Sequence, residues 1–281
     1  MSRREAADIE TLERGEVLRA GTGRHGKAWG QVLGRTGGSV VSAHHLSVAF
    51  GGSDRTPEPS LMCTRARGTN AVVRRSFRPA PFRDDAAMPI YLALGDSISI
   101  DDYAGVRGGG AASQLARKLG VDLVDLTRDG NTTQGVLADL ARAPASADVV
   151  TLTAGGNDLL GGESPRAILR RLDQITQRLQ PLGGRTVVNT VYDPSDGDNA
   201  IGRRELGLSR LATVELRRRL NALNGGIAKL ACERGLLLAD LERLCHGHGL
   251  ASDEPWFVQV IEPNLASATA IAEHWHELLT S

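Results

Sequence analysis

Aromatic residues and long apolar runs are scarce in this chain of 281 residues. Only 4% of the residues are aromatic, and no apolar run approaches the roughly 20 residues that a membrane-spanning helix needs. The N-terminus does not show a charged start followed by about 7 to 15 apolar residues, which is the pattern of a secretory signal. The sequence therefore predicts neither a membrane span nor a signal peptide.

Patterns typical of metal and cofactor sites are also missing. The three cysteines, Cys63, Cys232 and Cys245, have no CxxC or zinc-type spacing, which fits a reducing compartment and predicts a cytoplasmic protein. His246 and His248 lack a third ligand at a recognised spacing. No glycine pattern of a dinucleotide or phosphate loop opens a helix. We predict no metal and no cofactor.

The formal net charge of zero hides an asymmetry. Residues 1–87 carry 14 basic residues against 9 acidic ones, whereas residues 88–281 carry 19 against 24. An Arg-rich leader can bind nucleic acid or another anionic surface, but here the arginines are scattered and aromatics are few, so we predict no nucleic-acid partner. The leader mixes Arg, Gly, Ser, Thr and Pro without a period, which predicts a disordered or loosely structured extension.

A regular pattern of predicted strands and helices begins near Met88, which stands two residues before the first predicted strand. The native start could lie there, with 1–87 an extension of the reading frame, or the leader could be a genuine tail. From residue 90, short apolar segments alternate with amphipathic helical patterns. Strands are predicted at 90–95, 121–126, 148–153, 185–191 and 235–240. This order predicts an α/β domain over 88–281 with a parallel sheet between two helical layers.

The helical patterns carry recognisable ends. Ser164 and Pro165 are typical of an N-cap and a first-turn proline, and Gly235 stands where the next long helix should end. A last helix is predicted after Pro263 and Asn264. In such sheets ligands bind beyond the carboxyl ends of the strands.

Polar residues follow three successive predicted strands at that end. Ser97 stands in Gly-Asp-Ser, Gly130 in Asp-Gly-Asn, and Asn157 in Gly-Gly-Asn-Asp. Each motif alone is a common turn or helix cap, but their order along the sheet is specific. A serine can attack a carbonyl, and backbone N–H groups with an asparagine amide can hold the resulting oxyanion.

Over about residues 89–280 the chain resembles the SGNH, or GDSL, family of esterases and lipases. Ser97, Gly130 and Asn157 match three of the four family blocks. The resemblance implies a flavodoxin-like three-layer sandwich with a five-stranded parallel sheet and Ser97 as nucleophile. It also implies an oxyanion hole formed by the Ser97 and Gly130 backbone N–H groups and the Asn157 side chain.

The fourth block departs from the family pattern. Glu262 occupies the place of the histidine and Gln259 the place of the aspartate in the Asp-x-x-His block. A carboxylate is a weak base for a serine hydroxyl unless burial raises its pKa. Because His248 follows the fifth predicted strand, we predict it as an alternative base, oriented by Glu262, Asp253 or Glu254.

Two functions stay open from the sequence. The first is a serine esterase that hydrolyses a small-molecule carboxylic ester through an acyl-serine intermediate. The polar segment 192–208 is predicted as a loop that borders its pocket, which favours short-chain or polar acyl groups. The second is an inactive module of the same fold that binds an acyl or carboxylate ligand. The sequence does not fix the oligomeric state.

Overall fold

The computed structural model describes residues 88–281, and the prediction of a loosely structured leader over 1–87 lies outside them. Five parallel strands form one sheet in the order β2-β1-β3-β4-β5. Their bounds are β1 Ile90–Gly95, β2 Asp122–Thr127, β3 Val149–Thr153, β4 Arg185–Asn189 and β5 Leu237–Ala239. The predicted five-stranded parallel sheet is confirmed, with each strand within two residues of its expected place.

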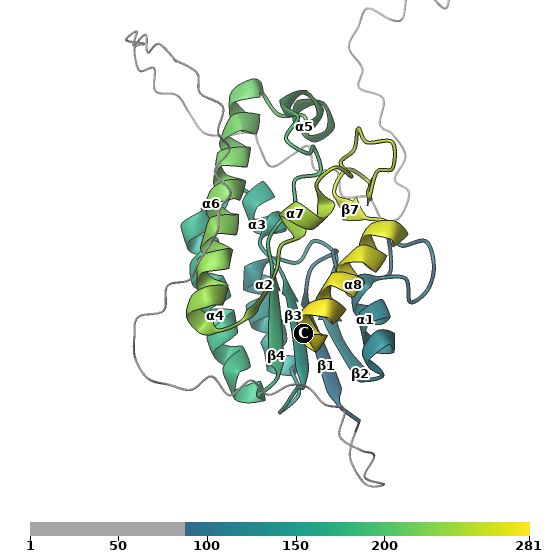
Figure 1. The fold of residues 1–281 in the computed structure, drawn as a ribbon. Coiled ribbons are helices and arrows are strands. Elements are labelled where there is room, and N and C mark those ends of the chain that lie inside the picture. The colour runs from purple at the N-terminus through teal and green to yellow at the C-terminus, as the bar shows by residue number, and fades with distance from the viewer. Residues whose placement is uncertain (1–87) are drawn as a thin grey trace, which may run out of the picture. The chain divides into compact units, whose positions relative to one another are not determined.

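The sheet separates two apolar cores. Along β1, Tyr91 and Ala93 face one core, whereas Leu92 and Leu94 face the other, because side chains alternate along a strand. The first core is covered by α1 Ala111–Leu119, α7 Leu241–Cys245 and α8 Leu265–Thr280. The second is covered by α2 Thr133–Asp139, α3 Gly156–Leu160, α4 Pro165–Leu179 and α6 Arg210–Arg234. The predicted three-layer α/β/α sandwich is confirmed, and Figure 1 shows the paired helices α4 and α6, and α1 and α8.

The predicted helix ends are present. Ser164 caps α4 with its side chain and Pro165 opens the helix. Gly235 ends α6 in the left-handed conformation, at φ 66°. Asn264 caps α8, which is fixed to the sheet by Trp275. The buried Trp275 indole donates to Asn189 Oδ1 at 2.7 Å, and so ties the last helix to the end of β4.

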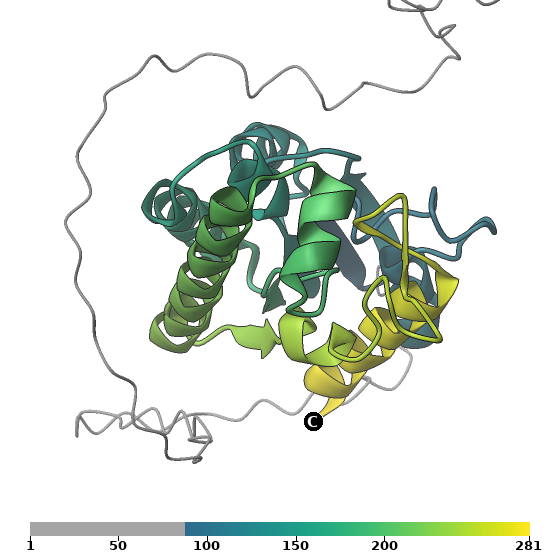
Figure 2. The same ribbon diagram turned by 90° about the horizontal axis from the view of Figure 1, so that it is seen from above.

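Two segments beyond the strand ends have more structure than the sequence predicted. Segment 192–208, expected as a loop, contains helix α5 Asn199–Leu206, which Asp198 caps. Segment 257–263 forms a small hairpin of β6 Phe257–Val258 and β7 Glu262–Pro263. Figure 2 shows α5 in the view from above, between α6 and α8. Short 3-10 turns at Leu140–Arg142 and Gln180–Leu182 follow α2 and α4.

No helix of the described part of the chain is both long enough and apolar enough to cross a membrane.

Candidate active site

The end of β1 delivers Ser97 through a tight backbone crossing. Gly95 has φ +137°, and a Cβ placed there would lie 1.9 Å from the Thr153 carbonyl oxygen, so only glycine fits. The next residue, Asp96, donates its backbone N–H to that same Thr153 oxygen at 3.1 Å. This contact between the ends of β1 and β3 fixes the position of Ser97, whose residue surface is 8% exposed.

Asn157 and Gly130 come from neighbouring loops. Asn157 lies in the first turn of α3, and its amide donates to the Asn131 carbonyl at 2.9 Å. Gly130, at φ +65°, precedes Asn131 directly. Asn131 is itself held by a bond from its amide to the Gly95 carbonyl at 3.0 Å. The end of β1 and the two loops are therefore joined by hydrogen bonds, and the second N–H of the Asn157 amide remains for a ligand oxygen.

A buried carboxylate fixes the turn behind Asn157. Asp158 accepts from the Thr133 backbone N–H at 2.9 Å and from the Thr133 hydroxyl at 2.6 Å. It also pairs with Arg171 of α4 at 3.1 Å. The Asp158 side chain is 2% exposed, so these donors replace its water. Asp158 thus connects α2, α3 and α4 immediately below the candidate site.

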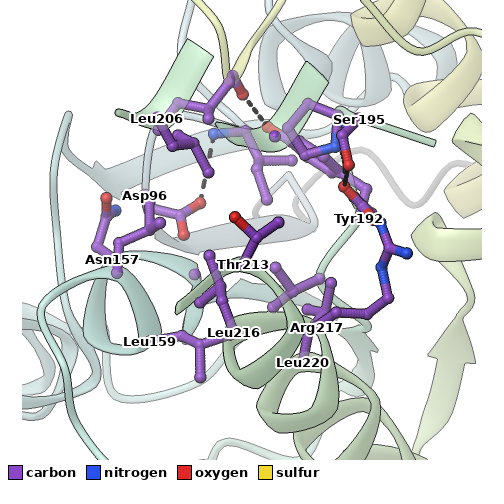
Figure 3. A pocket seen from close by; sticks show the side chains of 18 of the residues that line it. Asp96, Asn157, Leu159, Tyr192, Ser195, Leu206, Thr213, Leu216, Arg217 and Leu220 are labelled. Carbon is purple, nitrogen blue, oxygen red and sulfur yellow. Dashed lines mark hydrogen bonds and ion pairs between the residues drawn. The ribbon is translucent and has the colours of Figure 1, made fainter. Parts of the chain in front are cut away.

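Ser97 and Asn157 line one pocket of about 800 Å³, open mouth included. The pocket walls are mainly apolar and come from α3, α5, α6, the β6–β7 hairpin and the segment after β4: Leu159, Leu160, Val191, Leu206, Leu216, Leu220 and Ile261. Figure 3 shows Asp96 and Asn157 on one side of this pocket, and Tyr192, Ser195 and Arg217 on the opposite side.

Glu262 lies buried beside Ser97. Its residue surface is 7% exposed, and its Oε2 atom has no hydrogen-bond partner among the described residues. Burial raises the pKa of Glu262, a hydrogen bond with the Ser97 side chain lowers it, and the nearby charge of Asp129 raises it again. The net effect is a raised pKa, because desolvation is the largest cause. The carboxylate is thus in contact with the hydroxyl of the predicted nucleophile.

Tyr192 holds the strand that carries Glu262, and Asp96 adds a second buried acid near it. Tyr192 donates its hydroxyl to the carbonyl of Ile261, and its ring stacks on Phe257 at 4.6 Å between centroids. Asp96 is 3% exposed, and burial raises its pKa to about 7, opposed by the backbone N–H of Ile98 and increased by the charge of Glu262. Ser97 therefore lies between two buried acids.

His248 makes other contacts. Its ring stacks on Trp256 at 3.9 Å with an interplanar angle of 5°, and its Nδ1 lies 3.3 Å from the Glu254 carbonyl oxygen. It is not among the described residues that line the pocket. The predicted orienting carboxylates do not contact it either: the Glu254 contact is made by the backbone. His248 as base stays a prediction that this geometry does not support.

Tyr192 lies in the segment predicted to border the pocket, whereas no role was predicted for Asp96 or Arg217, and all three line the pocket. Asp96 stood inside the Gly-Asp-Ser motif, so its position was visible, but its burial was not. Arg217 could have been found from its spacing to Thr213, Leu216 and Leu220, which places the four residues on one face of α6. Within residues 88–281, no group of three or more His, Cys, Asp or Glu residues is placed to hold a metal ion.

A family model for GDSL-like lipases and acylhydrolases matches residues 93–266. A comparison with curated proteins gives no match. Among solved structures, the extracellular lipase of Streptomyces rimosus is 20% identical, with 68% of this chain and 98% of the lipase covered and a TM-score of 0.52. The phospholipase A1 of Streptomyces albidoflavus is 19% identical, with coverages of 69% and 98% and a TM-score of 0.53.

A third solved structure is the acetylxylan esterase of Geobacillus stearothermophilus. It is 16% identical, with 69% of this chain and 94% of the esterase covered and a TM-score of 0.52. At these identities the three likenesses show the shared fold. The matched range 93–266 contains Ser97, Gly130, Asn157 and Glu262.

Proposed function

We propose that this chain, which belongs to the GDSL-like lipase/acylhydrolase family, is a serine esterase that uses Ser97 as its nucleophile. Family membership supports ester hydrolysis as the general activity. One observation carries the finer assignment: Ser97 lines the same pocket as Asn157, and its side chain interacts with the buried carboxylate of Glu262.

In the proposed reaction, Ser97 Oγ attacks the ester carbonyl carbon and Glu262 takes the hydroxyl proton. The carbonyl oxygen becomes an oxyanion held by the backbone N–H groups of Ser97 and Gly130 and by the Asn157 amide. When the intermediate collapses, the bond to the alcohol breaks and Glu262 returns the proton to that oxygen. Water then attacks the acyl-serine by the same route, releasing the acid and restoring Ser97.

Glu262 is the proposed base because burial removes the usual objection to a carboxylate. An exposed glutamate, with a pKa near 4.3, accepts a serine proton poorly, and a raised pKa makes it a better acceptor. The hydrogen bond with Ser97 supplies the required contact. His248, the alternative base, has contacts to Trp256 and Glu254 instead.

The pocket walls support an aliphatic acyl chain. The sequence favoured short-chain or polar acyl groups because segment 192–208 is polar, but five leucines of α3, α5 and α6 contribute to the lining. Apolar surface of this kind stabilises a bound chain by about 0.8 kcal/mol for each buried CH₂ group. We therefore propose a small-molecule ester with an acyl chain of several carbons. A cytoplasmic location stays a prediction.

Hydrolysis of 4-nitrophenyl hexanoate by the full chain tests the proposal. Ser97→Ala should reduce kcat/KM by at least about 10³-fold, because removing the nucleophile leaves only binding and oxyanion stabilisation. Ser252→Ala, a serine outside the pocket lining, serves as the matched control. If the chain is instead an inactive acyl-binding module, wild type and Ser97→Ala should show the same negligible turnover.

A further inference from the structure

The proposed ester pocket carries a cation at the end opposite Ser97. Figure 3 shows Arg217 across the pocket from Asp96 and Asn157, with Leu216 and Leu220 of the same helix between. Arg217 is the one basic residue among the described residues of the lining. The pocket thus has a reacting end, apolar walls and a positively charged far end.

The Arg217 guanidinium is poorly satisfied. Its Nε atom is buried and has no hydrogen-bond partner in the described part of the chain. Its nearest counter-charge is Asp193, whose Oδ2 lies 3.5 Å from Arg217 Nη2, which is long for a hydrogen bond. The Arg217 side chain as a whole is 29% exposed, so the Nη nitrogens are the donors that an acceptor on a ligand can reach.

The carboxylate of Asp193 is only a partial acceptor for Arg217, because it already accepts hydrogen bonds from its own loop. Asp193 Oδ1 accepts from the Ser195 backbone N–H at 2.9 Å and from the Ser195 hydroxyl at 2.5 Å. Asp193 Oδ2 accepts from the Gly197 N–H at 3.3 Å. The Asp193 carboxylate therefore stabilises the turn of its own loop. The planar guanidinium group of Arg217 keeps N–H donors for a second carboxylate.

We propose that Arg217 selects esters whose acyl chain ends in a carboxylate, that is, monoesters of aliphatic dicarboxylic acids. The chain packs against the leucines, the ester carbonyl lies at Ser97 and the free carboxylate reaches Arg217. When they are ionised, Asp96 and Glu262 near Ser97 repel the carboxylate from the reacting end and so favour this orientation. This assignment deepens the proposed esterase function and rests on it.

The experiment compares chain-matched pairs of substrates. Mono-4-nitrophenyl succinate, adipate and suberate end in a carboxylate, and 4-nitrophenyl butyrate, hexanoate and octanoate end in a methyl group. Wild type should prefer the carboxylate ester by about tenfold or more in kcat/KM at the length that reaches Arg217. Arg217→Met, which keeps the apolar stem, should lower this preference ratio about 10- to 100-fold.

Two variants control the comparison. Arg218→Met removes the neighbouring cation, whose side chain is 71% exposed and paired with Glu215, and should leave the preference ratio unchanged. Arg217→Lys keeps the charge and loses the fork, so its ratio should lie between wild type and Arg217→Met. If Arg217 only stabilises the Asp193 turn, Arg217→Met lowers kcat/KM for the carboxylate ester and for the methyl-ended ester by the same factor. An unchanged preference ratio therefore overturns the proposal.

Calorimetric binding separates this inference from the esterase proposal. Adipate should bind wild type at least about tenfold more tightly than it binds Arg217→Met, with the uncharged 1-hexanol showing no such difference. This result would support the Arg217 site even if no ester were hydrolysed, in which case only the esterase function would fail. Equal adipate binding by the two proteins, both folded by circular dichroism, overturns the Arg217 assignment.

Discussion

The buried carboxylate of Glu262 lies beside the Ser97 side chain, whose interaction with it lowers the pKa of Glu262, although 164 residues separate the two in the chain. The contact forms because β1 delivers Ser97 to the carboxyl edge of the sheet and the β6–β7 hairpin places Glu262 there. Tyr192 fixes the hairpin through the Ile261 carbonyl. In the proposed function this carboxylate is the base of Ser97, at the place that the sequence analysis predicts for the family histidine.

Glu262→Gln should lower kcat/KM for 4-nitrophenyl hexanoate by about 10²- to 10⁴-fold, because the amide cannot accept the Ser97 proton. The matched comparison is His248→Ala, which should change kcat/KM by less than about threefold because His248 stacks on Trp256 instead. The opposite pattern, with loss in His248→Ala and full activity in Glu262→Gln, would make the histidine the base.

The pH profile follows from the raised pKa of Glu262. A base works when deprotonated, so kcat/KM should rise with pH through a midpoint above the ordinary value of about 4.3. Glu262→His places an imidazole at the family position and should move this midpoint toward about 6.5. Identical profiles for wild type and Glu262→His would show that residue 262 does not carry the proton.

Asp96 should make the protein less stable as pH rises from about 4 to about 7. Burial raises its folded pKa to about 7, above the unfolded value of about 3.9, so the folded state binds the extra proton in this window. The free energy of unfolding should therefore fall across the window by up to about 4 kcal/mol. Urea unfolding at pH 4 and pH 8 measures the fall.

Asp96→Asn should reduce that pH-dependent fall, because the amide does not titrate. Asp122→Asn, at an exposed carboxylate at the start of β2, serves as the control and should retain the wild-type fall. A fall of equal size in wild type and Asp96→Asn would contradict the assignment to Asp96.

Asp158→Ala should destabilise the domain by about 3–5 kcal/mol, because it leaves the buried donors of Thr133 and the Arg171 charge without their partner. Glu163→Ala removes the other, half-exposed partner of Arg171 and should cost less than about 1 kcal/mol. Urea denaturation of both variants gives the comparison. Equal effects would mean that the Asp158 contacts contribute little.

The sheet and much of the site could be predicted because they depend on local pattern. Apolar segments ending in glycine and a polar residue marked β1 and β3, and therefore Ser97 and Asn157. Ser164 with Pro165 marked the start of α4. The Asp198 cap of α5 was present in the sequence too, but the surrounding polar residues concealed it, and the segment was predicted as a loop.

The rest depends on contacts between distant segments. The raised pKa of Asp96 comes from burial that no local pattern reports. The place of Arg217 in the pocket depends on how α6 packs over the sheet, and local spacing does not report that its Nε has no partner within residues 88–281. His248 follows β5 as expected, but its stacking on Trp256 could not be seen from spacing.

Covalent labelling with a serine-reactive fluorophosphonate, read by peptide mass spectrometry, tests the nucleophile most directly. A single adduct should appear on Ser97 in wild type, fall at least about tenfold in Glu262→Gln, and be absent in Ser97→Ala. An adduct on a different serine, or full ester turnover by Ser97→Ala, would contradict the assignment of this site.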